Sequence, residues 1–486
     1  MKKLISAVLC ALLALSLSTA FAAEDVTTDV LVIGGGGAGI ATAISAAEQG
    51  ANVLLIEKVG YLGGATIISG GKIPVANSRQ QDAAGIEDSV AALARDILRP
   101  SNYSTRQELV YTVAEKGKDV AEWMEDKMGV EWFLMDSLYY GQTQYRMLNA
   151  PGDGNGMTKK MIEYLNTFDN ITVMFETKGT GLLTDENNAV IGATAEGKDG
   201  AFNIMAKNVV LCTSGFAANK DMLKKYCPEI VDAYPMVAPG ATGEGIEWGV
   251  ALGAAVDNMH AYQGYGFYAE GVGAFGQGIA NAGGIMINTN TERFCNEYDG
   301  YSQIAPHVIA QPGHHVWLVF DQGVYEKNNL EAFEKKGLLM KADTIEGLAE
   351  ATGLDAAKLA AEIGKYEEGI AAGEDYMNRT KLPDSFTAPY YAVYMTSDLR
   401  HTQGGLVTDV AAHVLTADNE PIQGLYAAGG VTEGFSTHAG ADYMSGNGLL
   451  QALVFGKIAG ENAATEVRGE QQYVAYTGNG LDNYKD

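Results

Sequence analysis

Short apolar runs alternate with alanine-rich segments along most of this chain. The apolar run at 30–33 leads into a series of glycines and an alanine-rich segment, and a second apolar run follows at 53–56. Residues 88–98 and 107–127 carry apolar side chains at helical spacing. Strands that alternate with helices, with glycines at many of the junctions, predict an α/β fold with a parallel sheet.

Later segments extend this pattern. Residues 173–210 alternate short β-like runs with turns, which predicts a small antiparallel insertion. Residues 344–372 predict two helices, with Thr344 and Asp355 as N-caps. A last strand at 424–430 precedes Ser445-Gly446-Asn447-Gly448 and a helix that runs to about residue 464.

The glycines at 34–39 satisfy G-x-G-x-x-G between the first strand and the following helix. Gly34 permits a tight turn, Gly36 lets the backbone approach a pyrophosphate, and Gly39 lets helix and strand pack closely. The helix N-terminus offers unpaired N–H groups to phosphates. Glu57, at the end of the second strand, can accept hydrogen bonds from ribose hydroxyls. This order of elements predicts dinucleotide binding, without separating FAD from NAD.

The first 22 residues have the composition of a secretory signal peptide. They comprise a charged start, an apolar run and a small-residue end, in which Ala20-Phe21-Ala22 fits A-x-A cleavage. The apolar run is too short to span a bilayer, so a cleaved signal is favoured over an uncleaved anchor. We therefore expect a periplasmic or otherwise exported protein that does not span the membrane.

Charge and cysteines narrow the classes of partner and cofactor. A net charge of −27 makes nucleic acid and anionic membranes unsuitable partners; it fits either simple solubility or docking onto a basic redox partner. Besides Cys10 in the signal segment, Cys212, Cys227 and Cys295 form no C-x-x-C pair. We therefore expect no disulfide framework, iron–sulfur cluster or haem on this chain. The histidines show no metal-ligand spacing, so no metal site is expected.

Eight short motifs occur in the order that a known flavoprotein family shares. From residue 29 to about residue 464 the chain resembles the soluble fumarate reductases, urocanate reductases and 3-ketosteroid dehydrogenases. The resemblance implies a Rossmann-like FAD-binding domain from residues 23–258 and 401–486, with an inserted α+β capping domain at 259–400. The motifs are GGGGAG with IEK and LGGAT, LCTSGF, PGATGEG, GGIMIN with RF, PYYAV, RHTQGG, GLYAAGG and SGNGLLQALVFGKIAG.

The resemblance also implies non-covalent FAD and the residues that hold it. At Gly430 the family often has an acidic residue that meets the ribityl chain; Glu433 nearby could replace it, or the contact is missing. The implied cofactor residues are Gly34, Gly36, Gly37, Ala38, Gly39, Glu57, Lys58, Gly63, Gly64, Ala65, Thr66, Gly71, Thr213, Ser214, Gly215, Gly429, Gly430, Glu433, Ser445, Gly446, Asn447, Leu449 and Leu450.

Matched on these motifs, the substrate site departs from that of fumarate reductases. The position of their proton-donating arginine falls on Tyr301, and that of a carboxylate-binding arginine falls on Tyr443. The position of a substrate-binding histidine falls on Tyr265, and only His401 in RHTQGG keeps the fumarate reductase identity. Phenols cannot pair with carboxylates as two guanidiniums do, so the resemblance implies poor affinity for dicarboxylates.

A pocket lined by phenols suits a neutral or aromatic enone better than fumarate. RFCNEYDGY also resembles ketosteroid dehydrogenases, in which the tyrosine that matches Tyr301 is the acid/base and the one that matches Tyr443 binds the ketone. Each tyrosine could instead only pack against the flavin. Arg400 could hold one carboxylate and admit a monoacid such as an aryl-acrylate, and Arg146 is a weaker candidate of this kind.

Several functions remain open at this point. The favoured one is an exported FAD-dependent reductase of a C=C bond conjugated to a carbonyl. A ketosteroid-type dehydrogenase that runs the reverse reaction is the alternative; a fumarate or urocanate reductase with a rearranged carboxylate site and a non-catalytic flavin-binding protein follow. An exported reductase without haem needs a separate electron donor, and we expect a c-type cytochrome or a membrane-linked flavoprotein. The catalytic candidates are Tyr301, Tyr443, His401, Tyr265 and Arg400.

Overall fold

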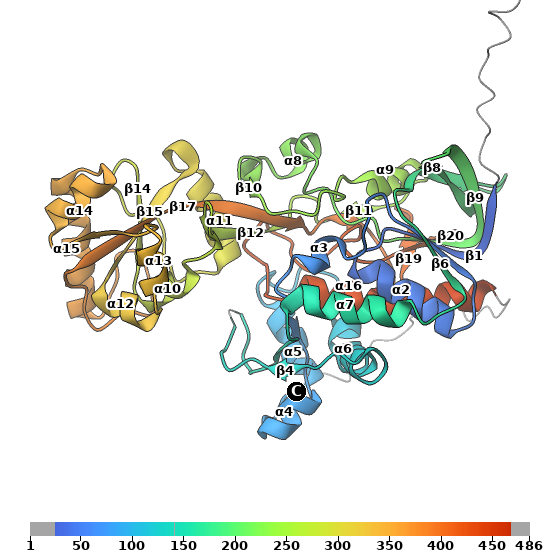
Figure 1. Cartoon of the computed structure of the whole chain (residues 1–486), viewed down its shortest axis with the longest axis horizontal. Helices are drawn as coiled ribbons and strands as arrows, with labels where there is room; N and C mark the ends of the chain where they lie inside the picture. The colour runs from blue at the N-terminus through green and yellow to red at the C-terminus, as the bar shows by residue number, and fades with distance from the viewer. Residues whose placement is uncertain (1–24, 140, 468–486) are drawn as a thin grey trace, which may run out of the picture.

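The computed structural model describes residues 25–139 and 141–467, which form two lobes with one large sheet each (Figure 1). The expected signal segment 1–22 lies outside the described residues. Within them, no helix is long and apolar enough to cross a bilayer. The helices are α2 (Gly37–Glu48), α3 (Gly64–Ile67), α4 (Arg79–Ala84), α5 (Val90–Leu98), α6 (Gln107–Met128), α7 (Asp153–Leu165), α8 (Lys220–Tyr226), α9 (Glu244–Ala251), α10 (Gln277–Ala282), α11 (Tyr301–Ile309), α12 (Gln322–Lys327), α13 (Glu331–Lys335), α14 (Ile345–Thr352), α15 (Ala356–Ala372) and α16 (Asn447–Val467).

The first sheet has the α/β architecture that the apolar runs predict. Its main strands follow the order β19-β20-β9-β1-β2-β6, and β1 pairs in parallel with both β2 and β9. Strand β20 lies parallel to β9, so the last part of the chain completes a sheet that the first part begins. The strands are β1 (Val26–Ile33), β2 (Val53–Ile56), β6 (Ile171–Met174), β7 (Lys178–Thr184), β8 (Val190–Gly197), β9 (Gly200–Leu211), β19 (His413–Leu415) and β20 (Pro421–Ala427).

Both faces of this sheet are buried. Side chains alternate across a strand, so Val30 and Val32 pack in a core with helices α2, α5, α6, α7 and α16. Leu31 and Ile33 face the opposite core, which includes residues of β8, β9, α8 and α9. Burial on both faces explains why the runs at 30–33 and 53–56 contain only apolar residues.

Helices α2 and α16 approach each other closely beneath the glycine-rich turn. A Cβ on Gly456 would lie only 2.6 Å from the Ala38 carbonyl oxygen, so a larger residue would separate the helices. The Thr42 hydroxyl donates to the Gly456 carbonyl at 2.9 Å and further joins the two helices. This contact places the N-terminus of α2 beside the middle of α16.

The second sheet forms the other lobe and is mostly antiparallel. Its order is β13-β12-β17-β15-β14, with β10 and β16 also paired to β17. Strand β17 has 13 residues and runs from this lobe to the junction with the first (Figure 1), where it ends at Arg400, His401 and Thr402. The predicted domain boundaries at 258/259 and 400/401 stay a prediction. The strands are β10 (Tyr234–Pro235), β12 (Tyr262–Ala269), β13 (Gly273–Ala274), β14 (Ile285–Asn288), β15 (Val316–Asp321), β16 (Met340–Ala342) and β17 (Tyr390–Thr402).

Several local predictions are confirmed. The helical pattern at 107–127 forms α6, and the segment 173–210 contains the antiparallel strands β7, β8 and β9. Thr344 accepts a hydrogen bond from the Gly347 N–H at 3.1 Å, and Asp355 accepts one from the Lys358 N–H at 2.9 Å. Both residues therefore cap their helices as the sequence predicts.

Candidate active site

A continuous cavity lies where the first sheet meets strands β12 and β17 of the second. Strands β1, β2, β9 and β20 all point their carboxyl ends at it, through Gly34, Glu57, Thr213 and Gly429. The N-termini of α2, α3 and α16 also reach its wall. In open α/β sheets the crevice beyond the carboxyl ends of the strands is where ligands bind.

The glycine-rich turn has the geometry that its sequence predicts. Gly34 has φ +106°, a left-handed conformation that favours glycine, and a side chain there would also collide with Cys212. A Cβ on Gly39 would collide with the Gly34 carbonyl oxygen, so Gly39 permits close packing of helix on strand. At Gly36 no atom lies within 4 Å of the place a Cβ would occupy, and this residue lines the cavity.

Two neighbouring residues at the end of β2 carry charge into the cavity wall. Glu57 is 9% exposed, and its carboxylate accepts hydrogen bonds from the N–H groups of Gly35 at 2.7 Å and Val59 at 3.0 Å. Lys58 donates to the Thr242 hydroxyl at 2.6 Å and pairs with Glu244 at 3.1 Å. The glutamate is thus rigidly oriented where a ribose would meet it.

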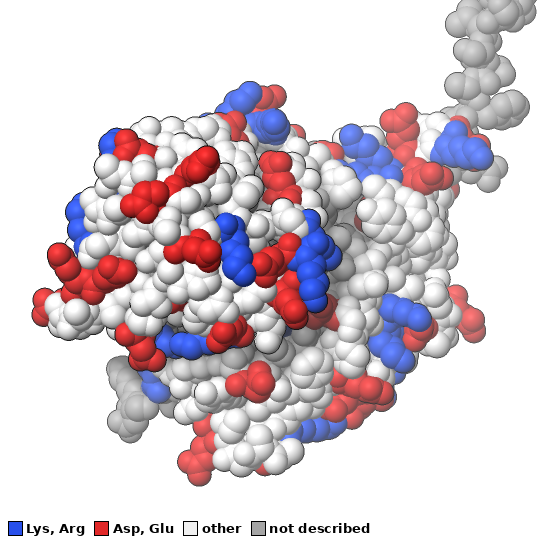
Figure 2. All heavy atoms as spheres, turned by 60° about the vertical axis from the view of Figure 1, so that its left-hand side comes forward, with Lys and Arg blue, Asp and Glu red and all other residues white. Residues whose placement is uncertain are grey.

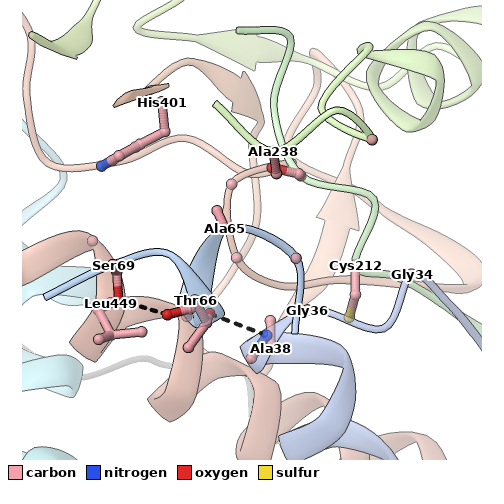
Figure 3. Close-up of a pocket in the computed structure, with 18 of the residues that line it drawn as sticks. Gly34, Gly36, Ala38, Ala65, Thr66, Ser69, Cys212, Ala238, His401 and Leu449 are labelled. Atoms are coloured by element: carbon pink, nitrogen blue, oxygen red, sulfur yellow. Dashed lines mark hydrogen bonds between the residues drawn. The ribbon is translucent and has the colours of Figure 1, made fainter. Parts of the chain in front are cut away.

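The short helix α3 closes the other side of the α2 N-terminus. The Gly37 N–H donates to Thr66 Oγ1 at 3.2 Å, and the Ser69 hydroxyl donates to the Thr66 carbonyl at 2.8 Å. Figure 3 shows these two bonds at the base of the cavity, with His401 and Ala238 on the opposite side. Thr66 and its neighbours therefore form a wall that runs from the phosphate-binding turn toward His401.

Unpartnered polar atoms in this region fit a large polar ligand. The Thr213 hydroxyl on the cavity wall is buried and has no hydrogen-bond partner among the described residues. Neither does Oε1 of Gln403, another lining residue, nor the two polar side-chain atoms of Asn447 at the start of α16. Together with the open space at Gly36 and the N-terminus of α2, where the N-cap Gly36 has no side chain, they match the needs of a flavin dinucleotide.

Most of the predicted cofactor residues line the cavity, and six do not. Gly39, Gly63, Gly215 and Leu450 pack behind the wall, and Asn447 is 1% exposed there. Those on the wall are Gly34, Gly36, Gly37, Ala38, Glu57, Lys58, Gly64, Ala65, Thr66, Gly71, Thr213, Ser214, Gly429, Gly430, Ser445, Gly446 and Leu449.

Glu433, the sixth, does not support the expectation that it meets the ribityl chain. Its side chain is 2% exposed and pairs with Arg106 at 3.0 Å, outside the set of residues that line the cavity. Burial raises the pKa of this carboxyl to about 7. The side chain faces Arg106 because a buried carboxylate needs a partner, and this guanidinium supplies one.

All five catalytic candidates meet at the end of the cavity near β12 and β17. The ring centroids of Tyr265 and Tyr301 lie 5.3 Å apart, and those of Tyr301 and Tyr443 lie 6.2 Å apart. The His401 ring lies 5.7 Å from that of Tyr443. The group is built by strand β12, helix α11, strand β17 and the segment before α16. Its members are distant in the sequence: Tyr265 and Tyr443 are 178 residues apart.

Burial holds the three tyrosines and His401 in their neutral forms, whereas Arg400 stays charged beside Asp398. Burial is the main cause that raises the pKa of Tyr301 to about 12, and it raises the pKa of Tyr443 well above its usual value. It lowers the pKa of His401 to about 4, so the imidazole is neutral at pH 7. The Tyr301 hydroxyl donates to Ser445 Oγ at 3.1 Å. The site therefore offers uncharged hydrogen-bond donors and a protonated phenol.

The two arginine candidates differ completely in position. Arg400 lines the cavity, and its Nε and Nη2 donate to Asp398 at 2.7 and 2.8 Å. Arg146 does not line the cavity: its side chain is 0% exposed and pairs with Asp88 and Asp96. The expectation that Arg146 could bind a substrate carboxylate is therefore wrong, because two buried carboxylates already bind its guanidinium.

Sequence reasoning missed several residues of the cavity wall. The segment 238–240 had a signal, because the motif PGATGEG begins within it, but the motif was not connected to the site. Gln263 lies in no motif, whereas Gln403 lies within RHTQGG, which gives a signal but no role for this residue. The missed residues include Ser69, Gly70, Lys72, Ala238, Pro239, Gly240, Gln263, Gln403 and Gly448.

A sequence model of the FAD binding domain family matches residues 29–449. The chain belongs to this family. A probable fumarate reductase, Ifc3, of Shewanella frigidimarina (strain NCIMB 400) is 31% identical to this FAD binding domain protein over 446 residues, which cover 90% of this chain and 75% of that protein. The urocanate reductase of Eggerthella lenta is 32% identical over 462 residues, 91% of this chain and 76% of the relative.

The fold of this FAD binding domain protein agrees with a solved relative. The open conformation of a flavocytochrome c3 fumarate reductase matches with a TM-score of 0.79 and 31% identity, over 91% of this chain and 79% of that one. The protein is a flavin oxidoreductase with FAD as cofactor, of the class that acts on CH–CH bonds. In the described part of the chain, no group of three or more potential metal ligands lies together.

Proposed function

We propose that this flavoprotein is an exported reductase of a C=C bond conjugated to a carbonyl group. The observation that carries the proposal is the group of Tyr265, Tyr301, Tyr443 and His401 on the wall of the cavity that fits the cofactor. Relatives that reduce fumarate and urocanate support the reaction class. FAD, when bound, supplies the hydride for the β-carbon of such a substrate.

Tyr301 donates the proton to the α-carbon. Its pKa of about 12 means that it carries a proton at pH 7, and a phenol can transfer that proton to a developing enolate. The hydrogen bond to Ser445 holds the hydroxyl in the cavity, and rotation about its C–O bond turns the same proton toward a substrate. Removal of the phenol oxygen alone should therefore stop protonation without disturbing the cavity.

Tyr443 and His401 polarise the substrate carbonyl. Nδ1 of His401 lies 3.2 Å from the Thr402 carbonyl oxygen, which accepts from the other tautomer, and 3.3 Å from the Gln403 side-chain amide. In the tautomer whose Nδ1 accepts from this amide, Nε2 carries the proton and can donate to a carbonyl oxygen. Neutral donors aimed at the oxygen where charge develops stabilise the transition state in the manner of an oxyanion hole.

A separate protein supplies the electrons, either a c-type cytochrome or a membrane-linked flavoprotein. The net charge of −27 favours a basic partner, because opposite charges steer the two proteins together. The sequence of residues 1–22 supports export to a compartment in which such a donor operates.

A ketosteroid-type dehydrogenase is the second candidate. The pair of Tyr301 and Tyr443 favours it, because the residue that protonates a carbon in one direction removes the same proton in the other. The two candidates differ in direction and not in the residues that act. A saturated ketone that bleaches the oxidised flavin, with no reoxidation by enones, would support the dehydrogenase.

The test measures how fast unsaturated acceptors reoxidise the dithionite-reduced enzyme. The panel contains an enone, an aryl-acrylate, urocanate and fumarate, and flavin absorbance is followed anaerobically. We expect the enone or the aryl-acrylate to react fastest and fumarate to react slowly, because tyrosines stand where two arginines would bind its carboxylates. Fumarate turnover comparable to that of the best acceptor would contradict the proposal.

A further inference from the structure

Arg400 is a cation held on the wall of the substrate end of the cavity. Its side chain is 23% exposed, and the partner carboxylate of Asp398 is fully buried. The two side chains form a bidentate pair through Nε and Nη2. The Arg400 guanidinium also lies over the Tyr265 ring, 4.9 Å from its centroid, so a carboxylate and an aromatic ring fix its position together.

This arrangement leaves one edge of the guanidinium available. An arginine has five N–H donors and can bind two carboxylates, one on the Nε–Nη2 edge and one on the Nη1–Nη2 edge. Asp398 occupies the first edge, and Nη1 makes no hydrogen bond to any described residue. Because Arg400 lines the cavity, a carboxylate that enters the cavity can take the second edge.

The other cations on the cavity wall have different partners. Lys58 and Lys178 both pair with Glu244, and Lys72 lies near Asp153. Next to the tyrosines, Arg400 is therefore the cation on the described cavity wall that can bind a substrate carboxylate. His401 is neutral at pH 7 and does not add a second positive charge. One guanidinium with one open edge suits a single carboxylate and not two.

The rest of the surrounding surface is aromatic. The rings of Tyr265, Tyr301 and Tyr443 form a chain of contacts next to the guanidinium. Tyrosine rings present large apolar faces that pack well against a flat aromatic group. We propose that Arg400 anchors the carboxylate of a 3-aryl-acrylate, which makes monocarboxylic aryl-acrylates the substrate class; this rests on the proposed function.

The test compares two probes of nearly the same shape. Cinnamate carries a carboxylate, and 4-phenyl-3-buten-2-one replaces it with a neutral methyl ketone. We expect kcat/KM of the wild type to be at least about tenfold higher for cinnamate, because a charge-assisted bidentate pair outweighs a neutral hydrogen bond. Arg400→Gln should lower kcat/KM for cinnamate by about 100-fold, the loss typical of a truncated buried charge pair, and lower kcat/KM for the ketone much less, so that the preference for cinnamate is lost.

Two further variants separate anchoring from stability. Arg400→Gln leaves Asp398 buried without its partner, so the double variant Arg400→Gln/Asp398→Asn is measured as well, with FAD content checked in each. Arg79→Gln is the matched control: it removes an arginine whose side chain is 43% exposed and pairs with Asp126 outside the cavity. This control should change kcat/KM for neither probe.

A binding measurement complements the rates. Titration of the oxidised enzyme with 3-phenylpropanoate, the saturated product of cinnamate, should perturb the flavin spectrum in the wild type and much less in the double variant. An equal loss of kcat/KM for both probes in the variants would contradict the proposal that Arg400 anchors a carboxylate, as would a wild type that prefers the ketone. Either result would leave the proposed function intact. If no acceptor of either kind reoxidises the flavin, the proposed function itself fails.

Discussion

At the residue scale, the phenol of Tyr301 is the group whose removal is most informative. Tyr301→Phe keeps the ring contacts with Tyr265 and Tyr443 and deletes the oxygen bonded to Ser445. We expect FAD to remain bound and the reduction rate to fall by about 100- to 10,000-fold, the usual contribution of a general acid.

Tyr443→Phe is the matched comparison. If Tyr443 only polarises the carbonyl, its loss should act mostly on KM and cost less than that of Tyr301. Steady-state rates, measured in both variants together with their flavin occupancy, show which tyrosine donates the proton. A Tyr301→Phe enzyme that keeps more than about a third of the rate, under 1 kcal/mol of barrier, would make Tyr301 a packing residue.

The pH dependence of reduction follows from the same burial. Tyr301 remains protonated until the pH approaches its pKa of about 12, and His401 remains neutral above its pKa of about 4. We therefore expect kcat to show no inflection from these residues between about pH 5.5 and pH 9. An inflection near pH 7 that Glu433→Gln removes would indicate Glu433, whose pKa burial raises to about 7, and an inflection in this range that the variant keeps would contradict the expectation.

At the element scale, the N-terminus of α2 tests the cofactor site without disturbing the fold. Gly36 has φ −74°, which alanine adopts readily, and a Cβ there meets no protein atom within 4 Å. Gly36→Ala should therefore fold normally but lose much of its FAD, because the methyl group takes space next to the phosphates. Gly60→Ala, also without close neighbours but off the cavity wall, is the control.

The outcome is measured as flavin content and as thermal stability of the apoprotein. Equal FAD content in Gly36→Ala and Gly60→Ala would mean that the pyrophosphate does not approach Gly36.

The end of α16 is joined to strand β19 by a titratable contact. His413 lies 2.9 Å from Asp409 and 3.3 Å from Glu466, and these carboxylates raise its pKa to about 9 against the effect of burial. A histidine whose pKa is raised in the folded state adds stability below its unfolded pKa of about 6.5. That stability is lost as the pH rises through about 9.

We expect His413→Gln to lower the free energy of unfolding by about 1–3 kcal/mol at pH 6 and by much less at pH 10. Urea unfolding at the two pH values measures the difference between variant and wild type. A loss of the same size at both values would assign the effect to packing against Tyr426 and not to charge.

At the scale of the whole molecule, the two ends of the chain build one cofactor site and the middle covers it. Strand β20 joins β9, α16 packs on α2, and β17 brings Arg400 and His401 from the second lobe to the cavity. Figure 2 views the side of the second lobe, where acidic and basic side chains are interspersed. Charges of both signs are therefore mixed on this face, and the net charge of −27 is that of the whole chain.

FAD should be held by this assembly without a covalent bond. Cys212 is the cysteine on the described cavity wall, and burial raises its pKa to about 12, so it stays a poor nucleophile. Acid precipitation should therefore release about one FAD per chain into the supernatant. Flavin that remains with the pellet would contradict this, as would bound NAD.

Features that depend on neighbours in the chain could be determined from the sequence alone. The caps Thr344 and Asp355 bind N–H groups three residues ahead, and the glycine-rich turn and Glu57 belong to one strand–helix–strand unit in which Glu57 accepts from Gly35, 22 residues before it. Their geometry is local, so the pattern of residue types is enough to predict it. The family resemblance then supplied the order of the lobes and the positions of the tyrosines.

Only the tertiary structure decided which charges face the cavity. Arg146 and Arg400 were both open candidates in the sequence, but Arg146 pairs with Asp88 and Asp96, 58 and 50 residues away, and Arg400 lines the cavity. Glu433 likewise pairs with Arg106 across 327 residues. A buried charge must find a partner, and which partner it finds depends on how distant segments pack, which the sequence pattern does not record.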